Sequence, residues 1–125
     1  IREVERVLER IDPKYIFCPY WDDTHQDHRT LAEIVNSAAR NQRNILYYET
    51  PTTHTSFNPD VFVDIHDVLD DKLKTLVAHH SQIDKTNISG ATILEMAQAT
   101  AIFRGIQSRV RYAEGFVARR LFLGI

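Results

Sequence analysis

Residues 15–48, YIFCPYWDDTHQDHRTLAEIVNSAARNQRNILYY, decide the fold of this chain. The apolar run Tyr15–Pro19 ends in proline and is typical of a short strand that is buried on both faces of a sheet. A helix is expected over about residues 28–40, and residues 45–48 predict a second buried strand. The apolar stripe of that helix would comprise Leu31, Ile34, Val35, Ala38 and Ala39. A strand, a helix and a strand in this order are typical of a crossover unit in a parallel sheet.

The remainder of the chain continues this alternation of helices and strands. Apolar periodicity predicts helices over residues 4–11, 67–80 and 91–110, a strand over 61–65, and a last strand over 116–123. No repeat, linker or low-complexity stretch interrupts the pattern. The predicted fold class is therefore α/β, a Rossmann-like layered sheet with flanking helices.

Composition excludes several classes of protein. The chain has 125 residues, 43% of them hydrophobic, which suits one globular domain or part of one. Its 15 basic and 17 acidic side chains leave a net charge of −2, so no basic surface for nucleic acid is expected. No apolar stretch approaches the roughly 20 residues that span a bilayer. The single cysteine, Cys18, excludes an internal disulfide framework and suits a reducing, cytoplasmic location.

The first predicted helix begins immediately after Ile1, and no earlier segment is available to pack against it. Two interpretations remain open from the residues alone. The chain is either a complete small domain, or a larger domain that lacks its beginning.

The densest chemistry lies in residues 21–28, WDDTHQDH, between the first predicted strand and the helix that follows it. Loops at the carboxyl ends of parallel strands are where α/β proteins bind ligands. His28 would lie in the first helical turn, where the helix dipole favours the neutral, metal-binding ring. Asp27 could orient a histidine through a hydrogen bond, or it could simply cap the helix. Two histidines three residues apart fit a metal site and an ordinary loop equally well.

Several short motifs together resemble one known family. Phe17-Cys18-Pro19 followed by His25-Gln26-Asp27-His28 is similar to the second signature, H-x-D-H, of the PIG-L/LmbE-like zinc N-deacetylases. Gln26 stands where many members have proline. Further similar segments follow in the family's order: residues 47–49, residues 57–65, Lys72 with residues 79–82, and residues 112–116. The resemblance covers essentially the whole chain.

The family's first signature, A-H-P-D-D-E, does not occur in the chain. The resemblance therefore implies that residues 1–125 are the C-terminal portion of a single deacetylase domain, incomplete at its N-terminus. In the family that signature supplies two ligands of Zn²⁺ and the general base. The remaining zinc ligands are then expected from a missing N-terminal segment, and the fragment alone is expected to be inactive.

The resemblance also implies roles for individual residues. His28 would be the third zinc ligand. His25 would be the catalytic histidine that, as an imidazolium, stabilises the oxyanion and protonates the leaving amine. Asp27 would orient His25 or His28. Some relatives have a tyrosine two residues before the first histidine, but Asp23 stands at that position here.

The substrates that the resemblance implies are N-acetylglucosamine conjugates, small acetylated amino sugars that would yield acetate and a free amine. Glu49, Gln82 and Glu114 are the candidates for binding sugar hydroxyls, and Trp21 could stack on a pyranose face. For Glu49, Gln82 and Glu114 a structural role is at least as well supported: a solvated acid, a helix-end amide and a salt-bridged residue of the tail, respectively. For Trp21 a place in the core is favoured over stacking.

Two functions other than deacetylation are compatible with parts of the sequence. A metallo-β-lactamase type of site, H-x-H-x-D-H, needs histidine where Asp23 stands, which makes it improbable. The alternative from another class is a metal-free, degenerate interaction or structural domain of the same fold. A domain without its first strand would expose apolar surface, so homo-oligomers or association with the missing segment are expected.

Overall fold

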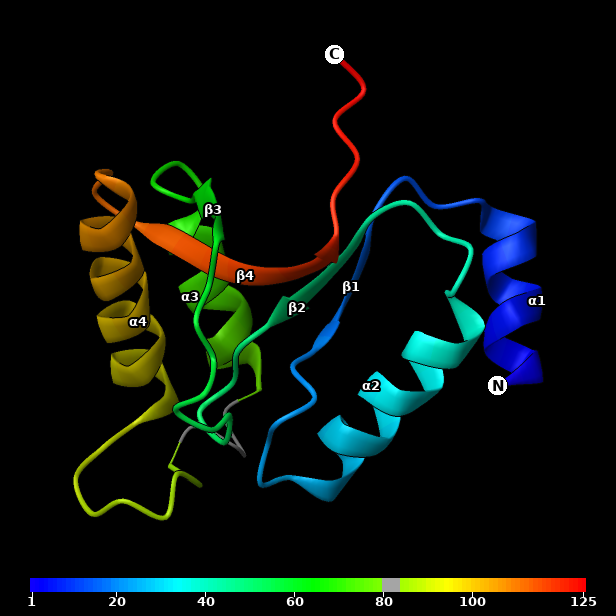
Figure 1. Cartoon of the computed structure of the whole chain (residues 1–125). Coiled ribbons are helices and arrows are strands. Elements are labelled where there is room, and N and C mark those ends of the chain that lie inside the picture. The colour runs from blue at the N-terminus through cyan, green and yellow to red at the C-terminus, as the bar shows by residue number, and fades with distance from the viewer. Residues whose placement is uncertain (80–83) are drawn as a thin grey trace. The chain divides into compact units, whose positions relative to one another are not determined.

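The computed structural model describes residues 1–79 and 84–125 (Figure 1). In these residues four strands form one sheet, in the order β1-β2-β4-β3. The elements in chain order are α1 (Arg2–Ile11), β1 (Ile16–Pro19), α2 (Gln26–Ala38), β2 (Ile45–Tyr48), β3 (Val61–Asp64), α3 (Leu69–Ala78), α4 (Ile93–Ser108) and β4 (Ala113–Arg120). β1 and β2 are parallel, whereas β2 and β4 are antiparallel. The predicted α/β class, a sheet flanked by helices, is confirmed.

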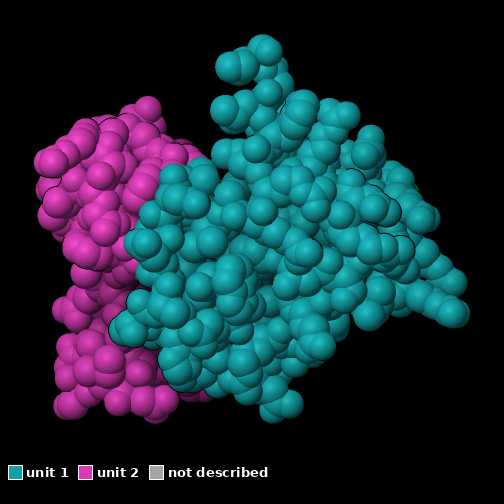
Figure 2. Space-filling view, viewed as in Figure 1, with its two compact units in different colours: residues 1–61, 116–125 teal, residues 62–115 magenta. Residues whose placement is uncertain are grey.

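The chain divides into two compact units, coloured separately in Figure 2. The first unit comprises residues 1–61 and 116–125, and it contains β1, β2, α1 and α2. Within it α2 packs on β1 and α1 packs on α2. Its core consists of Cys18, Tyr20, Val35, Ala39, Ile45, Tyr47 and Phe57. Burial raises the pKa of the Cys18 thiol to about 12, so this cysteine remains protonated and unreactive.

The second unit comprises residues 62–115 and is organised around α3 and α4, which pack on each other. Ile65, Leu69 and Ala101 form its buried core. α4 begins with a capping box, in which Thr92 and Glu95 each bond the backbone N–H of the other. No helix in the described ranges combines the length and apolar character that crossing a membrane requires.

The structure corrects several predictions about burial. β1 is not buried on both faces: Phe17 remains 52% exposed, whereas Cys18, on the opposite face, is buried. Leu31, assigned to the buried stripe of α2, is 43% exposed, and Ala32 is buried in its place. In α3 Leu69 is buried while Val77 is about half exposed, although both belong to the apolar stripe that predicts this helix. The last strand begins at Ala113, three residues earlier than expected.

The end of α4 makes a close backbone contact that only glycine permits. A Cβ atom on Gly105 would lie 2.7 Å from the carbonyl oxygens of both Val110 and Arg111. The chain turns back against α4 at this point, after Arg109 adopts the left-handed conformation that ends the helix.

Gly105→Ala is therefore expected to lower the free energy of unfolding by about 2 kcal/mol, since two backbone carbonyls must move. Urea titration followed by circular dichroism measures this change. Gly124→Ala is the matched control, because nothing lies within 4 Å of its added Cβ. Equal stability of the two variants would contradict the close contact.

Candidate functional site

The residues with the densest chemistry lie where β1 and β2 end. These strands are parallel, so the segments that follow them, residues 20–28 and 49–57, start from the same edge of the sheet. An isolated antiparallel β-bridge between Asp23 and Thr53 joins the two segments. In it the Thr24 N–H donates to the Thr52 carbonyl at 3.0 Å, and the His54 N–H donates to the Asp22 carbonyl at 3.0 Å. All of these residues belong to the first unit.

A buried carboxylate, Asp23, lies at the centre of this arrangement and is only 1% exposed. Its Oδ1 accepts the His25 backbone N–H at 2.8 Å. Its Oδ2 accepts the hydroxyls of Thr53 at 3.0 Å and Thr50 at 3.1 Å, and lies 3.1 Å from Nδ1 of His28. Burial alone raises the pKa of Asp23. The hydrogen bonds from the threonine-rich loop at residues 50–53, from His25 and from His28 outweigh the effect of burial and hold the pKa well below its usual range.

The two histidines of the H-x-D-H pattern lie side by side at the start of α2. His25 is the N-cap residue, and its Nδ1 accepts the backbone N–H of Asp27 at 3.2 Å. His28 lies in the first turn, as its sequence position predicts. The two rings stack with centroids 4.5 Å apart and planes 21° apart.

The position of Asp27 differs from that of Asp23. Asp27 is exposed and contributes its backbone N–H to the helix cap. Among the described residues, the carboxylate within hydrogen-bond distance of the His28 ring belongs to Asp23. Sequence reasoning gave Asp23 no function. The available signals were the run of acids at positions 22, 23 and 27 and the threonine-rich loop at 50–53.

The predicted substrate-binding residues are distributed over different parts of the chain. Trp21 is 45% exposed and contacts the rings of Tyr20 and Tyr47. Glu49 is half-buried and directly precedes Thr50. Gln82 lies outside the described residues.

Glu114 belongs to the second unit, where it accepts a hydrogen bond from Lys72 Nζ at 2.6 Å. This ion pair is about one-third exposed on each side and matches the structural alternative for Glu114, a salt-bridged acid.

Within residues 1–79 and 84–125, no group of three or more His, Cys, Asp or Glu side chains is placed to hold a metal ion. His28 contributes one imidazole, with its Nδ1 facing Asp23.

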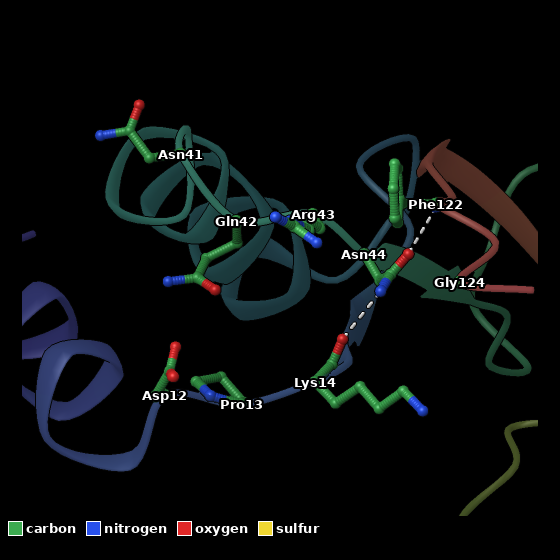
Figure 3. A pocket seen from close by; sticks show the side chains of 9 residues that line it. All are labelled: Asp12, Pro13, Lys14, Asn41, Gln42, Arg43, Asn44, Phe122 and Gly124. Atoms are coloured by element: carbon green, nitrogen blue, oxygen red, sulfur yellow. Dashed lines mark hydrogen bonds between the residues drawn. The ribbon is translucent and has the colours of Figure 1, made fainter.

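A cavity of about 530 Å³ lies at the opposite edge of the parallel pair, next to residues that precede β1 and β2 (Figure 3). The side chain of Asn44 closes one side. Its Nδ2 donates to the Lys14 carbonyl at 2.9 Å, and its Oδ1 accepts the Phe122 N–H at 2.6 Å. The Arg43 guanidinium lies over the Phe122 ring, 4.8 Å from its centroid. None of the predicted site residues lines this cavity.

No protein-family model matches the chain. Solved structures with a similar fold include the conserved protein TT1542 from Thermus thermophilus, with a TM-score of 0.79 at 23% identity. They also include GalB, the 4-carboxy-2-hydroxymuconate hydratase of Pseudomonas putida, with a TM-score of 0.76 at 17% identity. A third is the N,N'-diacetylchitobiose deacetylase of Pyrococcus horikoshii, with a TM-score of 0.73 at 23% identity.

These likenesses show a shared fold. They cover 98%, 98% and 94% of this chain, respectively. The chain in turn spans 59% of the first two proteins and 49% of the third, a little over half to about half of their lengths.

Replacing the buried carboxylate should destabilise the protein. Asp23→Ala leaves the hydroxyls of Thr50 and Thr53 and the N–H of His25 without their acceptor, so the free energy of unfolding should fall by about 2–4 kcal/mol at pH 7. The low pKa of folded Asp23 means that its stabilisation is present above the unfolded pKa, near 4, and is lost as the pH falls toward the folded value.

Chemical denaturation between pH 7 and pH 2.5 measures both effects. The difference in the free energy of unfolding between the wild-type protein and Asp23→Ala should become smaller below about pH 4. Asp27→Ala, which removes an exposed acid from the same region, should cost less than about 1 kcal/mol. A difference for Asp23→Ala that does not change with pH would contradict the ionised, hydrogen-bonded carboxylate.

Proposed function

We propose that this chain is part of a zinc-dependent N-deacetylase that removes the acetyl group from an N-acetylglucosamine-type conjugate in the cytoplasm. The observation that carries the proposal is the stacked pair His25 and His28, which begins α2 at the carboxyl edge of the parallel strands. The H-x-D-H pattern and the fold shared with a chitobiose deacetylase support it.

The donor chemistry of His28 fits one ligand position of zinc, which binds neutral imidazole nitrogens. The described residues supply no set of three ligands. The other ligands would come from a segment ahead of residue 1, as the resemblance to PIG-L/LmbE-like proteins implies. When bound, zinc lowers the pKa of its water to about 7 and polarises the acetamide carbonyl.

His25 would act on the substrate through Nε2. Its Nδ1 accepts the Asp27 N–H, so the proton of the neutral ring resides on Nε2. An Nε2–H group can donate to the acetamide oxygen as negative charge develops there. The role that the resemblance implies for His25, an imidazolium that stabilises the oxyanion and protonates the leaving amine, stays a prediction.

Four residues are proposed to bind the sugar. Trp21 has an exposed ring suited to stacking on a pyranose face, and Glu49 directly precedes the threonine-rich loop of the site. Gln82 and Glu114 remain candidates for binding sugar hydroxyls. Self-association remains an expectation from exposed apolar side chains such as Phe17 of β1.

The hydratase GalB favours a second candidate, since its fold is as similar to this chain as that of the deacetylase. In that case the same histidines would assist addition of water to an unsaturated acid. The third candidate is a metal-free interaction domain, which metal content and turnover distinguish from both enzymes.

The full-length natural protein should contain zinc and release acetate from N-acetylglucosamine conjugates. His28→Ala should lose the metal. His25→Ala should keep the metal but lose roughly 10²–10³-fold in turnover, the cost of removing one donor to an oxyanion. Metal analysis and an acetate assay measure these effects, with His66→Ala, an exposed histidine of the second unit, as control.

Wild-type activity in both His25→Ala and His28→Ala would contradict the proposed deacetylase function. Zinc content with hydration of an unsaturated acid, but no acetate release, would select the hydratase. A wild-type protein with neither zinc nor turnover would select the interaction domain.

A further inference from the structure

We propose that Asp23 is a positioning residue that fixes the tautomer of the His28 ring: in the neutral ring the proton lies on Nδ1, and the Nε2 lone pair is available. The consequence of this tautomer for zinc rests on the function proposed above.

The hydrogen bonds around Asp23 require Nδ1 of His28 to act as a hydrogen-bond donor. The Asp23 side chain has no exposed surface, so solvent supplies it with no donor. Oδ1 accepts from the His25 N–H, and Oδ2 accepts from the hydroxyls of Thr50 and Thr53. A carboxylate that accepts from these donors has no proton of its own to give. The ring nitrogen 3.1 Å away must therefore donate, because two lone pairs would otherwise face each other in a buried position.

The hydroxyls of Thr50 and Thr52 also favour a proton on Nδ1 of His28. Thr50 Oγ1 and Thr52 Oγ1 each lie 3.4 Å from His28 Nδ1. The Thr50 proton is directed to Asp23, so its oxygen can only accept from the ring. The Thr52 hydroxyl has a nearer acceptor in Thr50 Oγ1, at 3.0 Å. A proton on Nδ1 of His28 satisfies every one of these contacts.

The chemical consequence lies at the other ring nitrogen. A neutral imidazole with its proton on Nδ1 has its lone pair on Nε2, whereas the opposite tautomer has none there to bind a cation. The His28 side chain is 28% exposed, so the ring is not sealed from a ligand. A carboxylate hydrogen-bonded to the far nitrogen also raises the basicity of a metal-binding imidazole.

The ¹⁵N spectrum of the histidine rings tests the inference directly in the metal-free, full-length protein at pH 8. The His28 signals should show a protonated Nδ1 and an unprotonated Nε2. In Asp23→Asn the amide can turn its NH₂ group toward Nδ1, so the His28 proton should move to Nε2. Zinc affinity, measured by competition with a chromophoric chelator, should then fall about 10–100-fold.

Asp22→Asn is the matched control. It removes a neighbouring carboxylate whose contacts are to Ser56 and His54, so the His28 tautomer and the zinc affinity should not change. The backbone amide shifts of residues 20–28 and 49–57 show whether Asp23→Asn keeps the loop structure, so that a tautomer switch is distinguished from loss of the loops.

A wild-type His28 with its proton on Nε2 overturns the inference, as does an Asp23→Asn variant that keeps the wild-type tautomer. If Asp23→Asn does not fold, the wild-type spectrum alone decides. A wild-type ring protonated on Nδ1 in a protein that binds no zinc would uphold the role of Asp23 and sink the proposed function.

Discussion

The buried carboxylate of Asp23 is the constraint on which the candidate site depends. A buried charge is costly unless donors surround it, and this one has donors from its own loop and from the loop that follows β2. The two loops are consequently held at the same edge of the sheet. The His28 ring is drawn into the same cluster, while His25, whose N–H binds Asp23, caps α2. One side chain thus joins the fold of the first unit to its chemistry.

The local elements of the fold could be predicted because their signals lie within short segments. The apolar run at 45–48 and the stripe at 28–40 each identify an element regardless of its surroundings. Burial was less predictable. Phe17 and Leu31 are apolar residues in correctly predicted elements, yet both are about half exposed. Exposure depends on what covers each face of a strand or helix, and that covering is not encoded within the element itself.

In the candidate site, too, the local features could be predicted and the long-range contacts could not. The spacing of His25 and His28 places both at one helix start, which a sequence pattern can reveal. The partners of Asp23 in the threonine loop are 27 and 30 residues away in the chain, and no periodicity links them. Proximity in the sequence favours Asp27 instead as the carboxylate that orients His25 or His28. Long-range hydrogen bonds of this kind emerge only once the register of β1 against β2 is known.

Amide hydrogen exchange at His25 tests most directly whether Asp23 is a buried anchor. The N–H groups of His25 and His66 each donate to the carboxylate two residues earlier, at 2.8 Å and 2.9 Å, but Asp23 is buried whereas Asp64 is exposed. The anchor predicts that His25 exchanges about 100-fold more slowly than His66, after correction for intrinsic rates. Equal rates at the two amides would show that the loop opens freely, and would contradict the central role of Asp23.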